Sequence, residues 1–195
     1  MTDASSNCRL PDFIGIGAMR SGTSWLTKQL KQHPGIWTSA PKELHFFDRH
    51  FTDCPDDYGR HFSGAPESMI SGEITPAYAI LESGKIAVAR SWMPDLKLLF
   101  IMRDPVDRAW SHARKDFPQF HNKPVEDAQI DELREFMQLP QVSMRGDYLA
   151  CLKNWLEYYD QSQLWCGFLE QAATDPAALL GELFSFLGVN PGEGI

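Results

Sequence analysis

The stretch Gly17-Ala18-Met19-Arg20-Ser21-Gly22-Thr23-Ser24 follows a strand-like run, 12–16, and leads into a helical pattern that begins near Thr23. A strand, a glycine-containing loop and a helix in this order are typical of phosphate-binding α/β proteins, because loop N–H groups and a helix N-terminus attract anions. The glycine spacing is that of a nucleotide P-loop, G-x-x-x-x-G-K-[ST], but Thr23 occupies the lysine position and Arg20 supplies an earlier cation. The stretch predicts a P-loop-like phosphate site, and an ordinary turn is the alternative interpretation.

A second cluster follows the apolar run 96–102, which is typical of a strand buried on both faces. It reads Arg103-Asp104-Pro105-Val106-Asp107-Arg108-Ala109-Trp110-Ser111. Asp104 and Pro105 are a favourable N-cap and first helical residue. Arg103 is therefore expected at the carboxyl end of a strand, where open α/β sheets bind ligands, with Ser111 about two helical turns further on. The alternative is that Arg103 pairs with a carboxylate and Ser111 is a surface hydroxyl.

Taken together, these two segments resemble the sulfotransferases that use 3′-phosphoadenosine-5′-phosphosulfate (PAPS), especially the branch of heparan-type and many bacterial enzymes. Lys42-Glu43-Leu44-His45-Phe46-Phe47-Asp48 resembles the K-E-x-H-F-F-D motif of that branch, and Thr75-Pro76-Ala77-Tyr78 its S-P-A-Y motif. Arg145-Gly146-Asp147-Tyr148 and Phe186-Leu187-Gly188-Val189 resemble its closing helical part. The similarity runs from about residue 13 to residue 189.

The resemblance implies transfer of a sulfuryl group from PAPS to a hydroxyl or amine by in-line displacement, with PAP as product and no metal. It implies that the first loop binds the 5′-phosphosulfate, while the strand-end arginine and the helix serine bind the 3′-phosphate. The acceptor is expected to be a small molecule or a glycan. The residues expected to bind the donor are Arg20, Ser21, Gly22, Thr23, Ser24, Trp25, Arg103 and Ser111.

Sulfuryl transfer resembles phosphoryl transfer, in which catalysis consists mainly of positioning and electrostatic stabilisation. The loop N–H groups and Arg20 are expected to stabilise the charge that grows on the leaving phosphate. Glu43 is the expected base for the acceptor's proton, and His45 either orients the acceptor or is itself the base. The alternatives are a surface Glu43 paired with Lys42 and a His45 that merely packs against its aromatic neighbours.

The sequence departs from the family pattern at three places. Arg20 stands where many relatives carry lysine, which keeps the charge but provides a poorer proton donor. Ile74 stands where heparan-type relatives often carry lysine. The basic loop with which relatives cover the nucleotide is expected to be missing, since no Lys or Arg follows Lys153. A non-catalytic or degenerate PAP-binding protein is therefore one alternative, and a P-loop nucleotide kinase, which Thr23 opposes, is another.

Composition limits the class of protein. The formal net charge of −8 argues against a nucleic-acid-binding surface. The sequence has no apolar run of about 18 residues and no secretory leader pattern, so we expect a cytoplasmic, bacterial-type protein without a membrane partner. The four cysteines show no C-x-x-C spacing and the six histidines no H-x-x-x-H spacing, which predicts reduced thiols and no metal site.

Strand-like and helical segments alternate along the chain, which predicts a single α/β domain over residues 1–195 with three layers, α/β/α. Its sheet is expected to be mostly parallel and about five-stranded. The polar segment 118–126, with two prolines, is expected to be a mobile loop near the acceptor. Helices are expected at 86–93, 127–138, 146–159 and from Pro176, and strands at 12–16, 36–38, 68–72, 96–102 and 164–168.

Overall fold

The computed structural model describes residues 8–193, and its centre is a five-stranded sheet in the order β2-β3-β1-β4-β5. All four neighbouring pairs are parallel, which confirms the predicted sheet. Every residue of the central strand β1 is buried, as expected where helices cover both faces. The strands are β1 (Phe13–Gly17), β2 (Ile36–Thr38), β3 (Ile70–Ile74), β4 (Lys97–Met102) and β5 (Leu164–Phe168).

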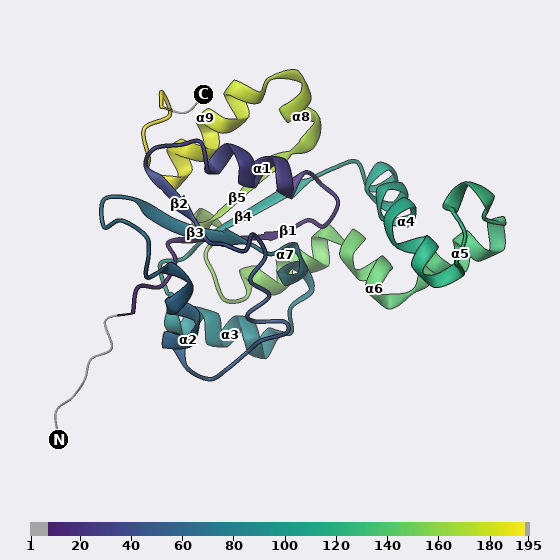
Figure 1. The fold of residues 1–195 in the computed structure, drawn as a ribbon, viewed down its shortest axis with the longest axis horizontal. Helices are drawn as coiled ribbons and strands as arrows, with labels where there is room; N and C mark the ends of the chain where they lie inside the picture. The colour runs from purple at the N-terminus through teal and green to yellow at the C-terminus, as the bar shows by residue number, and fades with distance from the viewer. Residues whose placement is uncertain (1–7, 194–195) are drawn as a thin grey trace.

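Helices cover both faces of the sheet, which confirms the predicted layers (Figure 1). One face carries α1 (Thr23–Leu30), α8 (Leu169–Thr174) and α9 (Pro176–Leu187), and the other carries α3 (Ser83–Trp92) and α7 (Tyr148–Leu156). Successive residues of a strand point to opposite faces. Accordingly, Leu99 packs in the cluster that contains Leu183 of α9, whereas Leu98 packs in the cluster that contains Trp155 of α7. The short helix α2 (Pro55–Gly59) lies near α3.

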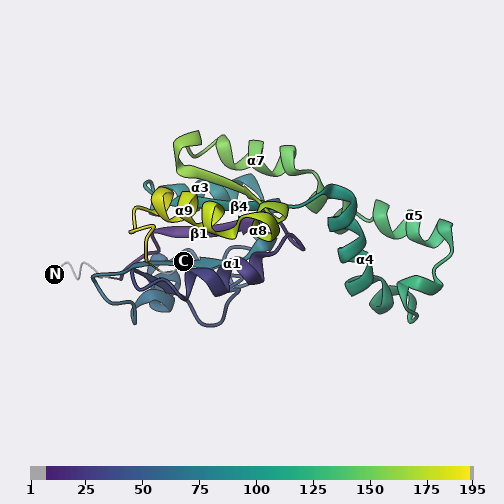
Figure 2. The same ribbon diagram turned by 90° about the horizontal axis from the view of Figure 1, so that it is seen from above.

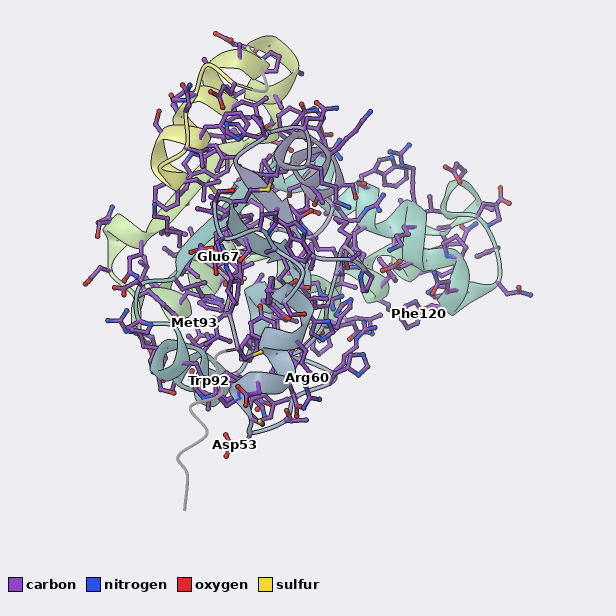
Figure 3. The ribbon with its side chains drawn as sticks, turned by 60° about the vertical axis from the view of Figure 1, so that its left-hand side comes forward. Asp53, Arg60, Glu67, Trp92, Met93 and Phe120 are labelled. Carbon is purple, nitrogen blue, oxygen red and sulfur yellow. The ribbon has the colours of Figure 1, made fainter. Side chains whose placement is uncertain are left out.

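Three helices form an arm that projects beyond the sheet, namely α4 (Pro105–His121), α5 (Ile130–Gln138) and α6 (Pro140–Ser143) (Figure 2). The arm has a small core of its own, in which the rings of Phe117 and Phe136 lie 5.6 Å apart between centroids. Phe120 lies on the outside of the arm with 56% of its surface exposed (Figure 3).

The predicted loop over 118–126 is wrong in its first part, because α4 continues through Pro118 to His121. A proline inside a helix removes one backbone hydrogen bond and is unfavourable. The buried ring of Phe117, packed between α4 and α5, supplies the opposing stabilisation. The helix ends at Asn122, whose φ of 52° is left-handed, and a 3₁₀ turn follows at Val125–Asp127.

Candidate active site

The loop after β1 has the backbone that its sequence predicts. A side chain at Gly17 would place its Cβ 2.5 Å from the ring of Phe100, so the loop leaves the sheet at a position that only glycine fits. Gly22, with a φ of 91°, precedes α1 and offers no side-chain cap. The first N–H groups of α1 are therefore available to an anion.

A cleft of about 390 Å³ opens at the carboxyl ends of the central strands. The chain builds β2 and β3 on one side of β1 and later β4 and β5 on the other, so the cleft lies at the point where open α/β sheets bind ligands. It is lined by Met19, Arg20, Gly22, Thr23, Ser24, Lys42, Glu43, Pro76, Arg103, Ser111, Lys115 and Leu169.

One side of the cleft joins the loop after β1 to helix α4. Arg20 Nε donates a hydrogen bond to Ser111 Oγ at 3.1 Å. Arg103 lies at the end of β4, and its Nη2 is 3.6 Å from a carboxylate oxygen of Asp107. Because the Asp107 side chain is 64% exposed, this ion pair is weak, and the Arg103 guanidinium remains available to a ligand.

The charges lining the cleft are mostly positive, although the chain as a whole is acidic. The lining includes one carboxylate, that of Glu43, and four cationic side chains, namely Arg20, Lys42, Arg103 and Lys115. A concave surface lined by one sign of charge concentrates its field and attracts ligands of the opposite sign. The cleft is therefore suited to a ligand with several anionic groups.

A second side of the cleft is built from ionisable side chains that contact one another. Glu43 Oε1 lies 2.8 Å from Lys42 Nζ, and its Oε2 lies 3.4 Å from His45 Nε2. His45 Nδ1 in turn lies 2.9 Å from a carboxylate oxygen of Asp48. Lys42 Nζ also donates to Ser24 Oγ at 3.2 Å, which connects this side to the loop. Glu43 thus lines the cleft, whereas His45 does not line it but contacts the Glu43 carboxylate.

The sequence profile of the Sulfotransferase domain matches residues 10–194. The chain belongs to the sulfotransferase family. It is 28% identical over 191 residues to human heparan sulfate glucosamine 3-O-sulfotransferase 3B1, a match that covers 95% of this chain and 48% of that protein. It is also 33% identical over 105 residues to the membrane-associated sulfotransferase kil1 of Dictyostelium discoideum, covering 52% of this chain and 22% of that protein. The chain spans about half the length of the human relative and a smaller share of the Dictyostelium protein.

Solved sulfotransferases share the fold. A sulfotransferase from Alicyclobacillus acidocaldarius superimposes with a TM-score of 0.77 at 27% identity, covering 94% of this chain and 83% of that one. A mouse sulfotransferase solved with PAP gives a TM-score of 0.62 at 20% identity, covering 93% and 60%. The resemblance of the sequence to this family is therefore confirmed.

Three predicted site residues of this sulfotransferase domain do not line the cleft with their side chains. Ser21 is buried, and its Oγ lies 3.4 Å from the Tyr148 hydroxyl. Trp25 packs, half-buried, against the core under α1 and α9. The His45 side chain is held between Glu43 and Asp48. The roles of Ser21, Trp25 and His45 remain predictions.

The fold brings Lys115 and Tyr148 to the site, although neither was among the residues predicted for it. Lys115 lines the cleft one helical turn beyond Ser111, and this spacing of four residues on a predicted helix was a usable signal. Tyr148 donates a hydrogen bond to the Arg103 carbonyl oxygen at 2.9 Å and also contacts Ser21. Its hydroxyl therefore joins the ends of β1 and β4 beneath the sulfotransferase cleft.

Within residues 8–193, no group of three or more His, Cys, Asp or Glu side chains is arranged to hold a metal ion. Over the same residues no helix is both long and apolar enough to cross a membrane. The four cysteines are unpaired thiols.

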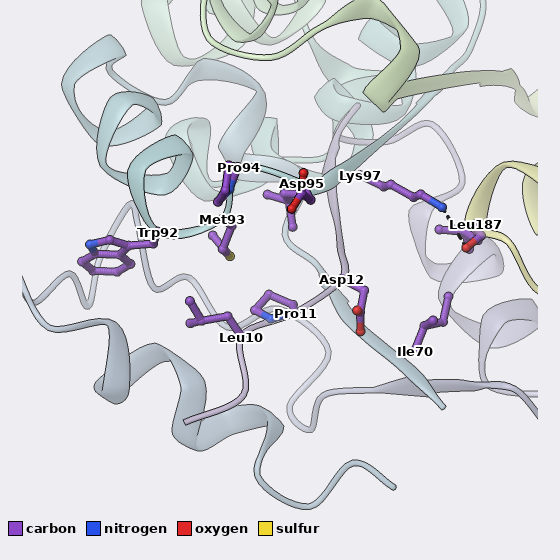
Figure 4. Close-up of a pocket in the computed structure, with 11 residues that line it drawn as sticks. Leu10, Pro11, Asp12, Ile70, Trp92, Met93, Pro94, Asp95, Lys97 and Leu187 are labelled. Carbon is purple, nitrogen blue, oxygen red and sulfur yellow. Dashed lines mark hydrogen bonds between the residues drawn. The ribbon is translucent and has the colours of Figure 1, made fainter. Parts of the chain in front are cut away.

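A second cavity, of about 330 Å³, lies at the opposite, amino ends of the strands (Figure 4). Two of its charged side chains, Lys97 and Asp12, have partners within the protein. Lys97 Nζ donates hydrogen bonds to the carbonyl oxygens of Phe186 and Leu187 at 2.8 and 2.9 Å. These bonds give partners to two carbonyl groups at the C-terminal end of α9. Asp12 accepts a hydrogen bond from the Ser71 N–H at 2.7 Å. None of the predicted site residues lines this cavity.

Proposed function

We propose that this sulfotransferase domain transfers the sulfuryl group of PAPS to a hydroxyl or amine of a small-molecule or glycan acceptor. The observation that carries the proposal is the single cleft in which Arg20, Arg103 and Ser111 converge with Glu43. A carboxylate in an otherwise cationic cleft at a phosphate-binding loop is suited to accept a proton beside a bound anionic donor.

The donor would bind along the cationic side of the cleft. The N–H groups at the start of α1 and the Arg20 guanidinium would bind the 5′-phosphosulfate. Arg103 and Ser111 would bind the 3′-phosphate, and Lys115 adds a further cation one turn away. Arg20 and Ser111 contact each other, and this hydrogen bond would connect the two proposed phosphate subsites before a ligand binds.

The reaction needs one proton transfer and one displacement. Glu43 takes the proton of the acceptor hydroxyl or amine as the acceptor atom attacks sulfur. The bond between sulfur and the bridging oxygen breaks in line with this attack, and its electron pair remains on the phosphate of PAP. Arg20 and the N–H groups of the loop stabilise the negative charge that develops there, and no metal takes part in the proposed step.

The names of the relatives support a glycan as one acceptor class, because the human relative is a heparan sulfate glucosamine 3-O-sulfotransferase, which acts on a sugar. The mouse neighbour was solved with PAP, the expected product. Both properties belong to those proteins and enter here as support for the proposal.

Incubation of the chain with PAPS carrying radiolabelled sulfate tests the proposal, with a panel of glycans, phenols and aliphatic alcohols and amines as acceptors. The expected result is labelled product from at least one acceptor, undiminished by EDTA. PAP binding without transfer to any acceptor would instead favour a non-catalytic PAP-binding protein, and the absence of both would contradict the proposal.

A further inference from the structure

Glu43 and His45 lie in a segment, residues 39–54, that has no helix or strand. A segment of this kind has no helical or strand ladder along its length, so turns and contacts with other parts of the protein must fix its backbone. His45 moreover has a φ of 52°, a left-handed conformation that is uncommon outside glycine.

Three consecutive backbone N–H groups of this segment donate to side chains of β3, of Thr75 and of the 3₁₀ helix Pro76–Ile80 that follows it. The Leu44 N–H donates to Glu73 Oε2 at 3.5 Å, and the His45 N–H donates to Thr75 Oγ1 at 3.4 Å. The Phe46 N–H donates to the Tyr78 hydroxyl at 2.9 Å.

Glu73 is the centre of this network. It is 1% exposed, and the Thr75 hydroxyl donates to the same oxygen, Oε2, that faces the Leu44 N–H. The Tyr58 hydroxyl donates to the other oxygen, Oε1, at 3.1 Å. Glu73 therefore contacts the segment directly through Leu44 and indirectly through Thr75.

Packing alone does not account for a carboxylate at this position. Burial raises the pKa of Glu73 to about 7, even though four hydrogen bonds favour the ionised form. A buried carboxylate is costly where an apolar side chain of similar volume would pack without that penalty. Strongly perturbed carboxylates of this kind occur preferentially at functional sites.

We propose that Glu73 is a positioning residue for sulfuryl transfer, which holds the segment carrying Glu43 at the cleft through the Leu44 N–H and through Thr75. Glu73 lies behind the cleft and is not among the residues that line it. The proposal rests on the proposed function, because it assigns Glu43 a role in that reaction.

Three variants test the proposal. Glu73→Gln removes the charge, and Thr75→Val removes the hydroxyl that relays the contact to His45. Tyr58→Phe is the matched control, because it removes a buried hydrogen bond to the same carboxylate on the oxygen that does not face the segment. Each variant is compared with the unmodified chain for kcat, the KM for the acceptor, the Kd for PAP, the melting temperature and amide hydrogen exchange.

We expect Glu73→Gln and Thr75→Val to lower kcat by about 10-fold to 100-fold, the cost of a small misplacement of a catalytic group. The Kd for PAP should stay within about threefold, a change of well under 1 kcal/mol. Amide exchange should increase over residues 42–48 and stay unchanged over residues 17–24. Tyr58→Phe should lower the melting temperature while kcat stays within about threefold.

Equal losses of kcat in Tyr58→Phe and Thr75→Val would show a structural role only and overturn the proposal, as would unchanged exchange over residues 42–48 in both Glu73→Gln and Thr75→Val. If Glu73→Gln does not fold, the kcat and the amide exchange of Thr75→Val alone decide whether the proposal holds. If the unmodified chain transfers no sulfate at all, the proposed function fails, while the exchange measurement still tests whether Glu73 and Thr75 hold the segment.

Discussion

Arg20 Nε donates a hydrogen bond to Ser111 Oγ at 3.1 Å, although 91 positions separate the two residues in the chain. One belongs to the loop after β1 and the other to the first half of α4, so this bond joins the two parts of the proposed donor site. The Tyr148 hydroxyl makes a second connection, because it contacts both Arg103 at the end of β4 and Ser21 in the loop after β1. The proposed donor site is therefore largely formed by contacts within the protein.

Arg103→Ala should weaken the binding of PAP by about 10-fold to 100-fold, because a hydrogen bond to a charged group contributes about 1.5–3 kcal/mol. The loss should be specific for the 3′-phosphate, so the variant should discriminate less between PAP and AMP than the unmodified chain does. Arg134→Ala is the control, since this exposed arginine of α5 pairs with Asp131 outside the cleft. Isothermal titration of each variant with both nucleotides makes the measurement, and an unchanged ratio of the two affinities would contradict this role of Arg103.

Glu43→Gln should abolish most transfer without affecting the donor site. Loss of a general base typically lowers the rate by about 10²-fold to 10⁴-fold, whereas the cationic side of the cleft is untouched. The Kd for PAP should stay within about threefold, a change of well under 1 kcal/mol. Turnover with labelled PAPS and PAP affinity are measured on the same preparation. Near-normal turnover would transfer the role of base to His45, whose Nε2 lies 3.4 Å from Glu43, and His45→Ala would then be the variant to measure.

Arg20→Ala should lower both PAP affinity and the rate of transfer, because its guanidinium would contact the donor in the ground state and in the transition state. Ser111→Ala separates the two effects. It removes the partner of Arg20 Nε but leaves the charge in place, so it should weaken PAP while kcat at saturating PAPS stays within about threefold. A Ser111→Ala variant with the same loss of kcat as Arg20→Ala would show that Arg20 needs this bond to act.

Glu73 should make stability fall as the pH rises. Burial raises the pKa of Glu73 from 4.5 to about 7, so the folded state holds this proton more tightly than the unfolded state. The resulting stabilisation is complete below pH 4.5 and is lost by about pH 7, a difference on the order of 3 kcal/mol. The titratable groups that face Glu73 are the hydroxyls of Tyr58 in α2 and Tyr78 in Pro76–Ile80, and burial raises the pKa of both above the ordinary value of 10.

The comparison of the unmodified chain with Glu73→Gln isolates this effect from the other carboxylates. Chemical denaturation at several pH values between about 5 and 8 gives the free energy of unfolding of both proteins. The variant should gain stability relative to the unmodified chain as the pH rises through this interval. A difference that does not change with pH would show that Glu73 titrates alike in the folded and unfolded states.

Much of the fold and of the cleft could be predicted from local sequence patterns. The loop after β1 and the segment from Arg103 to Ser111 each contain a strand end, a helix start and their polar residues within a few positions. The predicted N-cap Asp104 indeed accepts hydrogen bonds from the N–H groups of Val106 and Asp107. Such signals are local, and local backbone chemistry determines them.

The features that could not be predicted depend on contacts between distant segments. Pro118 lies inside α4 because Phe117 packs against a helix that begins thirteen residues later, at Ile130. Glu73 is the one charged residue of the buried strand β3, and only the fold places the Leu44 N–H beside it. Tyr148 likewise reaches Arg103 over 45 positions, a contact that no spacing in the sequence indicates.

Calorimetric titration of the unmodified chain with PAP in the presence of EDTA tests directly whether the cleft binds this nucleotide, with AMP and ATP as parallel ligands. We expect saturable binding of PAP without a metal, with an affinity at least about tenfold higher than that of AMP, because Arg103 and Ser111 are proposed to bind the 3′-phosphate that AMP lacks. Equal affinity for PAP and AMP, or binding of ATP only when Mg²⁺ is added, would contradict this expectation.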